Sequence, residues 1–100
     1  MAIRIQRSSG NVFTDMGFPR EEAAHLLIRT DLMLQLTALI AEHGLTQKQA
    51  AKALGVTQPR ISDLVRGRID LFSIDTLVDM LSRVGVAVTL KTKRRTRVVY

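Results

Sequence analysis

The sequence has no cysteine, two histidines and four aromatic residues among its 100 residues. Without cysteine there is no disulfide framework and no thiolate zinc site. His25 and His43 lie far apart in the sequence and have no matching cluster of ligands, so they do not indicate a structural metal centre. We therefore expect no metal and no cofactor, and a reducing cytoplasm is the default compartment.

Long apolar runs are also scarce. The first ten residues, MAIRIQRSSG, lack the continuous apolar region of a secretion signal. No run approaches the roughly 18 apolar residues that a membrane span needs. There is no glycine-rich phosphate loop, and neither histidine stands near a serine in a catalytic motif. These absences predict a protein that has no membrane segment and is not an enzyme.

Positive charge is present in excess and is unevenly distributed. The net charge is +6, of which residues 46–68 carry +4 and residues 85–100 carry +5, whereas residues 20–45 and 69–84 carry −2 each. Focused positive charge attracts a polyanion, because neutralised phosphates release their condensed counterions. The charge pattern therefore favours nucleic acid as the partner.

Helical periodicity predicts four helices. Pro19, followed by Glu21 and Glu22, is typical of a helix start, and Gly44 is typical of its end. The long helix between them has an apolar stripe at 28, 32, 36, 39 and 40, widened by Leu26, Leu27, Met33 and Leu34. Two short helices follow within 46–68, with Thr46 and Thr57 as N-caps. Ser73 is expected to cap a fourth helix that ends at Gly85.

The two ends of the chain have a different pattern. Residues 86–92 alternate like a strand, which must pair with AIRI (2–5), with RVVY (97–100) or with the same strand of a second subunit. MAIRIQR also alternates like a strand, and Val12, Phe13 and Met16 have the spacing of one helical turn. We thus expect an N-terminal arm (1–19), a helical domain (20–85), and a C-terminal strand with a basic tail (86–100).

Residues 46–68 have the skeleton of a helix-turn-helix. Ala51 is small enough to let two helices approach closely, and Gly55 suits the turn between them. Ile61, Leu64 and Val65 share one side of the second helix, which predicts that this side is buried.

Charged and polar residues occupy the other side of that second helix. Arg60 can contact guanine, Gln58 adenine, Asp63 the amino group of cytosine, and Pro59 a thymine methyl. The candidate base-reading residues are Gln58, Pro59, Arg60, Ser62 and Asp63. The candidate phosphate contacts are Gln47, Lys48, Thr57, Arg66 and Arg68. Arg60 and Asp63 also have the spacing of a surface ion pair in which Asp63 would orient Arg60.

The stretch LTQKQAAKALGVTQPRISDLVRGR (45–68) resembles the XRE-type helix-turn-helix of phage repressor and Cro proteins. Together with NVFTDMGF and FSIDTLVDMLSRVGVAVTL, it resembles HigA-like antitoxins and their stand-alone regulator relatives. The resemblance implies a compact all-α DNA-binding domain of four to five helices with a short C-terminal β-strand. It also implies a homodimer that represses transcription from a palindromic double-stranded DNA operator, often that of its own toxin–antitoxin operon.

By the same resemblance, Gln47 contacts phosphate, and Gln58, Pro59 and Asp63 occupy base-reading positions. Two residues depart from the family pattern. Pro59 stands where a polar residue is common, and Asp63 brings negative charge towards the phosphates, so the operator sequence is not implied.

Other functions remain open at this stage. The chain could be a stand-alone regulator, or a protein-interaction module that neutralises a toxin without reading DNA. Val12, Phe13, Met16 and Phe18 lie outside the motif, and either contact a small toxin protein or cover the long helix. RNA binding is a third possibility, but one Tyr and three Phe provide few platforms for stacking bases. The basic tail is either a solvated end or a phosphate-binding arm.

Overall fold

The computed structural model describes residues 2–6 and 12–92. The segment RVVY, one candidate partner of the C-terminal strand, and most of the basic tail lie outside these residues. The elements in chain order are β1 (Ala2–Gln6), α1 (Val12–Asp15), α2 (Arg20–Glu42), α3 (Gln47–Leu54), α4 (Gln58–Val65), the 3-10 turn η1 (Ile69–Leu71), α5 (Ile74–Arg83) and β2 (Ala87–Lys91). The expected helical fold with a short C-terminal strand is confirmed.

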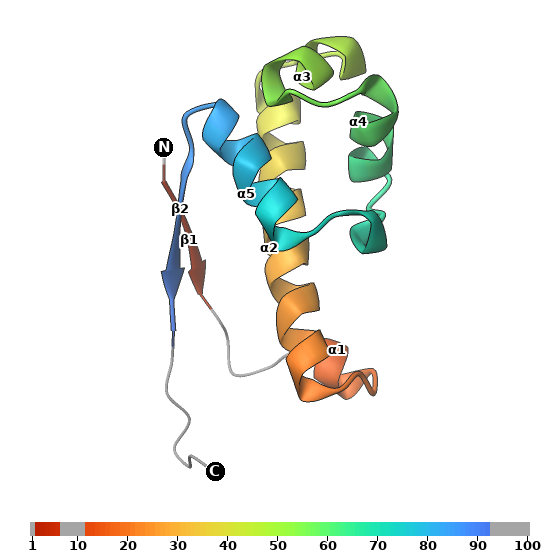
Figure 1. Ribbon diagram of the computed structural model, residues 1–100, viewed down its shortest axis with the longest axis vertical. Helices are drawn as coiled ribbons and strands as arrows, with labels where there is room; N and C mark the ends of the chain where they lie inside the picture. Colours follow the sequence, from red (N-terminus) through yellow and green to blue (C-terminus); the bar gives the residue numbers. More distant parts are fainter. Residues whose placement is uncertain (1, 7–11, 93–100) are drawn as a thin grey trace.

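Helix α2 is the central element of the domain. It contacts α1, α4, α5, η1 and β1, and Figure 1 shows α3 and α4 at its C-terminal end with α1 at the other end. The buried cluster combines Leu32 and Leu36 of α2 with residues of α3, α4 and α5. Leu34, which was expected to widen the apolar stripe, is instead 61% exposed. It lies on the side of α2 away from the stripe residues Leu32 and Leu36.

By length and mean hydropathy, 1.3 over its most apolar window, α2 could cross a membrane. No such segment was expected, because no continuous apolar run approaches the length of a membrane span. In the folded chain Leu32, Met33 and Leu36 are buried, and Ile28, Leu39 and Ile40 pack at the edge of the core. The high hydropathy of this helix therefore reflects its contacts on more than one side.

Asp31 is a half-buried acid on the same helix. Burial raises the pKa of its carboxyl above the ordinary value of 3.8, because desolvation disfavours the charged form. Its stabilising contribution is complete below pH 3.8 and is lost as the pH rises through the pKa of the folded state.

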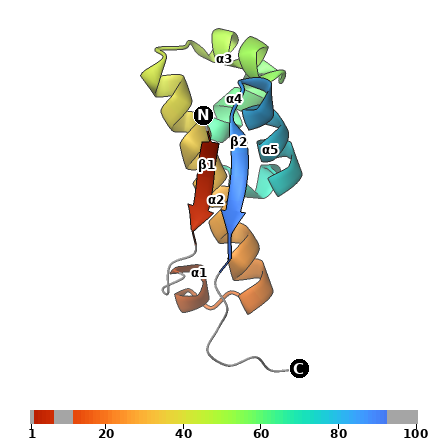
Figure 2. The ribbon, with the colours of Figure 1, turned by 90° about the vertical axis from the view of Figure 1, so that its left-hand side faces the viewer.

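The two ends of the described chain form a small sheet. Strand β1 pairs with β2 in parallel, with Ala2 opposite Ala87 and Gln6 opposite Lys91. Among the three partners considered for the C-terminal strand, the structure thus shows AIRI. Figures 1 and 2 show the two strands side by side, on the opposite side of α2 from α4. Burial falls along β2, from the neighbouring Val86 (3% exposed) to Leu90 (64%), because the strand runs away from the core.

The starts of the three later helices are capped in different ways. The Thr46 hydroxyl accepts the N–H of Gln49 at 3.1 Å, and Gln49 Oε1 accepts the N–H of Thr46 at 2.9 Å, which completes a capping box. Ser73 caps α5 as predicted, by accepting the N–H of Thr76 at 3.1 Å.

Thr57 stands at the N-cap position of α4, but its side chain makes no capping hydrogen bond. Pro59 has no N–H to donate, and the N–H of Arg60 is bonded to the Thr57 carbonyl at 3.1 Å. Thr57 is therefore the N-cap residue of α4, as predicted, but its side chain makes no capping hydrogen bond.

The two threonines form a matched pair for a stability measurement. We expect Thr46→Ala to lower the free energy of unfolding by about 1 kcal/mol, because it removes half of the capping box. Thr57→Ala should change it by less than about 0.5 kcal/mol, because no cap bond is lost. Urea denaturation followed by circular dichroism measures both. Equal losses in the two variants would show that the Thr57 hydroxyl does cap α4 in solution.

Candidate nucleic-acid interface

Helices α3 and α4 meet at a tight turn centred on Gly55. Gly55 ends α3 in the left-handed conformation, with φ of +71°, and the next N–H, that of Val56, is bonded to the carbonyl of Ala51 at 3.0 Å. A Cβ on Gly55 would come within 2.5 Å of the Arg83 guanidinium. The turn therefore needs glycine for its conformation, and the side chain of Arg83, from the last turn of α5, covers it.

Two buried side chains set the rotation of α4. Ile61 and Leu64 are 0% and 1% exposed, whereas Val65 is 52% exposed. The prediction that Val65 belongs to the buried side is therefore wrong. The predicted group of Ile61, Leu64 and Val65 would centre the buried side close to Ile61. With Val65 exposed, the centre lies midway between Ile61 and Leu64, about 30° away, since successive residues are about 100° apart.

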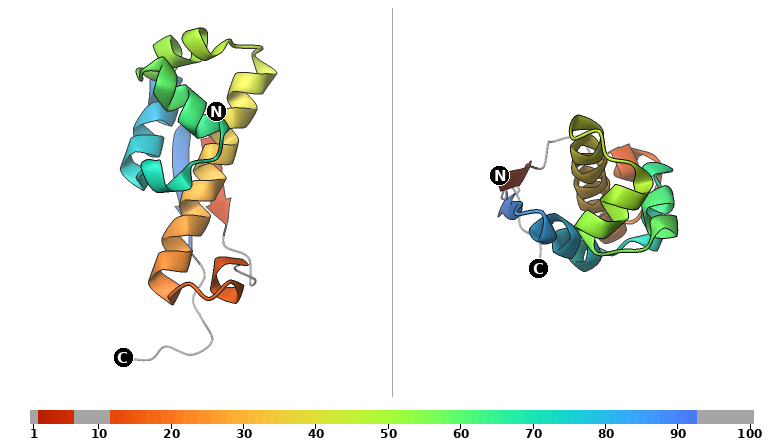
Figure 3. Two further views of the ribbon diagram at one scale, coloured as in Figure 1. Left: turned by 90° about the vertical axis from the view of Figure 1, so that its right-hand side faces the viewer. Right: turned by 90° about the horizontal axis from the view of Figure 1, so that it is seen from above.

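This rotation decides which residues of α4 point outward. Pro59 and Arg66 lie about 170° from the buried centre, and Ser62 and Asp63 about 130°. Gln58 lies at the side, at about 90°, and projects from the first turn. Gln58, Pro59 and Arg66 are exposed, while Ser62 and Asp63 are half-buried. Figure 3 shows the outer side of α4 at the surface, uncovered by any other described element.

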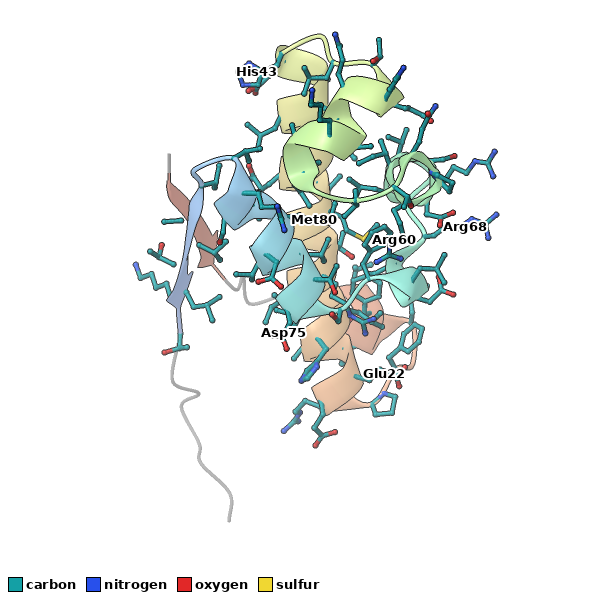
Figure 4. All side chains as sticks on the ribbon, turned by 45° about the horizontal axis from the view of Figure 1, so that its top comes forward. Glu22, His43, Arg60, Arg68, Asp75 and Met80 are labelled. Atoms are coloured by element: carbon teal, nitrogen blue, oxygen red, sulfur yellow. The ribbon has the colours of Figure 1, made fainter. Side chains whose placement is uncertain are left out.

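Arg60 lies only about 70° from the buried centre and turns inward. Its guanidinium carbon lies 4.2 Å from the centre of the Phe72 ring, and Nη1 donates a hydrogen bond to the Leu71 carbonyl at 2.8 Å. Figure 4 shows this side chain against the segment that follows η1, whereas Arg68 points away from the molecule.

The expected ion pair between Arg60 and Asp63 is not formed. One Asp63 carboxylate oxygen instead lies 4.0 Å from Nε of Arg68. Arg60 and Asp63 lie on the same flank of α4, about 60° apart. The pair does not form because the Arg60 guanidinium turns towards the Leu71 carbonyl and the Phe72 ring. Because the Arg68 side chain is 54% exposed, this ion pair contributes little to stability.

The candidate phosphate contacts are all exposed. Gln47 and Lys48 occupy the first turn of α3, Thr57 precedes α4, and Arg66 and Arg68 follow it. The Thr57 hydroxyl is available because it does not cap the helix. Positive charge therefore stands in the first turn of α3, on Lys48, and directly after α4, on Arg66 and Arg68.

Some residues important to this geometry were not found from the sequence. Leu71, Phe72 and Arg83 hold α4 and the turn, yet they lie beyond the motif. The only sequence signal was the apolar pair Leu71–Phe72 directly before the Ser73 cap, and it did not point to Arg60. In the described part of the chain, no three His, Asp or Glu side chains gather as metal ligands would.

Helix α1 and the residues directly after it carry a second exposed group of side chains. Val12, Met16 and Phe18 are 56%, 66% and 36% exposed. Phe13 and Phe18 meet edge to face with ring centres 6.1 Å apart, and α1 packs on the start of α2. The N-terminal arm thus covers part of α2 and also presents apolar surface.

Comparison with known proteins agrees with this geometry. Residues 12–93 match the family described as "Helix-turn-helix domain". A solved structure of a protein assigned to the XRE family of transcriptional regulators is similar, with a TM-score of 0.66 and 28% sequence identity, over 79% of this chain and 91% of that chain. No curated protein matches. The chain belongs to the helix-turn-helix family, and it is an XRE-type DNA-binding transcriptional regulator.

Proposed function

We propose that the protein is a cytoplasmic, homodimeric repressor that binds a palindromic operator with α4 in the major groove. The observation that carries this proposal is the anchoring of α4. Ile61 and Leu64 bury one side, and polar residues occupy the other side of a segment with a net charge of +4. In this motif, the N-terminal part of the second helix meets the base edges.

The exposed residues divide into two groups by chemistry. Gln58 can form two hydrogen bonds with adenine, Pro59 can touch a thymine methyl, and Asp63 can accept from cytosine. Gln47, Lys48, Thr57, Arg66 and Arg68 have donors suited to phosphates on either side of the groove.

A fragment of the gene's own promoter tests the repressor function. We expect Gln58→Ala to weaken specific binding by about 1–3 kcal/mol and to relax the preference at one base pair. Lys48→Ala should weaken binding to every sequence alike and lower the salt slope by about 1. Fluorescence anisotropy over a salt series measures both effects.

Lys52→Ala is the matched control, with the same charge in the last turn of α3. Its salt slope should change less than that of Lys48→Ala. If the wild-type protein binds no promoter fragment at low salt, the repressor function is wrong.

Dimerisation follows from the need to read two half-sites, which lie about 34 Å apart on one side of the duplex. We infer that α5 and β2 form the interface. An isolated pair of parallel strands is marginally stable, and Leu90 is a large apolar side chain exposed beside this pair.

Leu90→Lys tests this interface, with Leu34→Lys as its control. The two leucines are 64% and 61% exposed, but Leu34 lines an apolar groove of about 390 Å³ between α2 and α4. We expect Leu90→Lys to raise the dimer dissociation constant at least tenfold, and Leu34→Lys to leave it unchanged. Sedimentation equilibrium measures both. If Leu34→Lys weakens the dimer and Leu90→Lys does not, the interface lies at the groove instead.

The apolar surface of α1 supports a more specific role, that of an antitoxin which autoregulates its operon. If a neighbouring reading frame encodes a small toxic protein, co-expression of this chain should restore growth. Met16→Asp should abolish the rescue, whereas Leu34→Asp, equally exposed on α2, should not. Promoter binding without any rescue would favour a stand-alone regulator. Rescue without promoter binding would favour a protein-interaction module.

A further inference from the structure

Arg60 is the arginine closest to the start of α4, yet its guanidinium is engaged within the protein. It donates to the Leu71 carbonyl at 2.8 Å and lies 4.2 Å from the centre of the Phe72 ring. Leu71 is the last residue of η1, so its carbonyl has no partner in that turn. Phe72 is 1% exposed and belongs to the core.

Both contacts are of a kind that resists release. A hydrogen bond from a guanidinium to a carbonyl is charge-assisted and stronger than a neutral one. A cation within about 6 Å of an aromatic ring centre is attracted to the ring. To reach a guanine, the Arg60 guanidinium would have to give up both contacts and leave the end of η1 without a donor.

The contacts also join two separate parts of the fold. They tie the first turn of α4 to the segment that leads into α5, whereas Ile61 and Leu64 tie the middle of α4 to the core. Ile61 and Leu64 lie close to one line along α4. Anchoring these two side chains alone would still let the helix rotate about that line. Arg60 leaves this line on one flank and opposes that rotation.

We propose that Arg60 is a positioning residue that fixes the angle at which α4 enters the major groove and reads no base itself. This inference rests on the proposed function. Base recognition then falls to Gln58, Pro59, Ser62 and Asp63. The operator half-site is accordingly recognised through an adenine opposite Gln58, without a guanine contact by Arg60.

The role of Arg60 can be tested by measuring the affinity of the protein for every single-base-pair variant of the operator half-site. The resulting profile distinguishes a residue that positions α4 from one that reads a base. In Arg60→Ala, we expect the discrimination against wrong bases to shrink at all positions that α4 reads. Phe72→Leu, which keeps an apolar side chain but removes the ring, should give the same altered profile. Gln58→Ala is the control, with about 5- to 150-fold discrimination lost at one position only. If Arg60→Ala erases discrimination at a single G·C pair and preserves the rest, Arg60 is a base reader.

These comparisons are made at a temperature at which circular dichroism shows each variant to be folded. A variant that is merely destabilised, with its helix angle unchanged, would keep the wild-type profile of base preferences, and this result would overturn the proposal.

A measurement on the wild-type protein applies even if a variant fails to fold. The Phe72 ring should shift the NMR signals of the Arg60 side-chain protons, because the guanidinium lies over the ring. We expect the shift to persist in the operator complex. Its loss on binding would show that Arg60 leaves the ring, and would overturn the proposal. Failure of the wild-type protein to bind any operator would instead refute the proposed function, with the shift in the unbound protein unaffected.

Discussion

The burial of Ile61 and Leu64 is the constraint on which the rest of the interface depends. An eight-residue helix is too short to be stable alone in water. Each fully buried side chain of this kind contributes about 1.5–3 kcal/mol, and these two are in contact with the core built on α2 and α5. Their direction sets which side of α4 faces outward. In the proposed function, the way α4 meets DNA is therefore set by apolar packing on its inner side.

The helices were predictable because their signals are local. The apolar stripe of α2, the threonine before α3, the serine before α5 and the glycine of the turn each act within a few residues. The rotation of α4 was predicted less well, because Val65 has the spacing of a buried residue and only the surrounding packing shows that it is exposed. Among the candidate site residues, Arg60 differs most from expectation. Its partners lie 11 and 12 residues further along the chain, beyond any helical repeat.

Basic residues and base-reading candidates occupy different parts of this surface. The basic residues stand at the start of α3 and just after α4. Between them, the outward side of α4 offers an amide, a proline, a hydroxyl and a carboxylate. This arrangement suits the proposed function, in which the charged ends would contact phosphates and the outward side of α4 would read bases. Asp63 fits this division because Arg68 offsets part of its charge at 4.0 Å.

The pairing of β1 with β2 imposes an order on folding. Ala2 pairs with Ala87, so β1 is synthesised before the helices but has no partner until almost the whole described chain has been made. The helices need only nearby residues, and their contacts close short loops. Pairing β1 with β2 closes a loop that contains all the helices, which costs more conformational entropy than closing the short loops between helices. The strand pairing is therefore expected to form late. The local contacts of the turn between α3 and α4 are therefore expected to form before β1 and β2 pair.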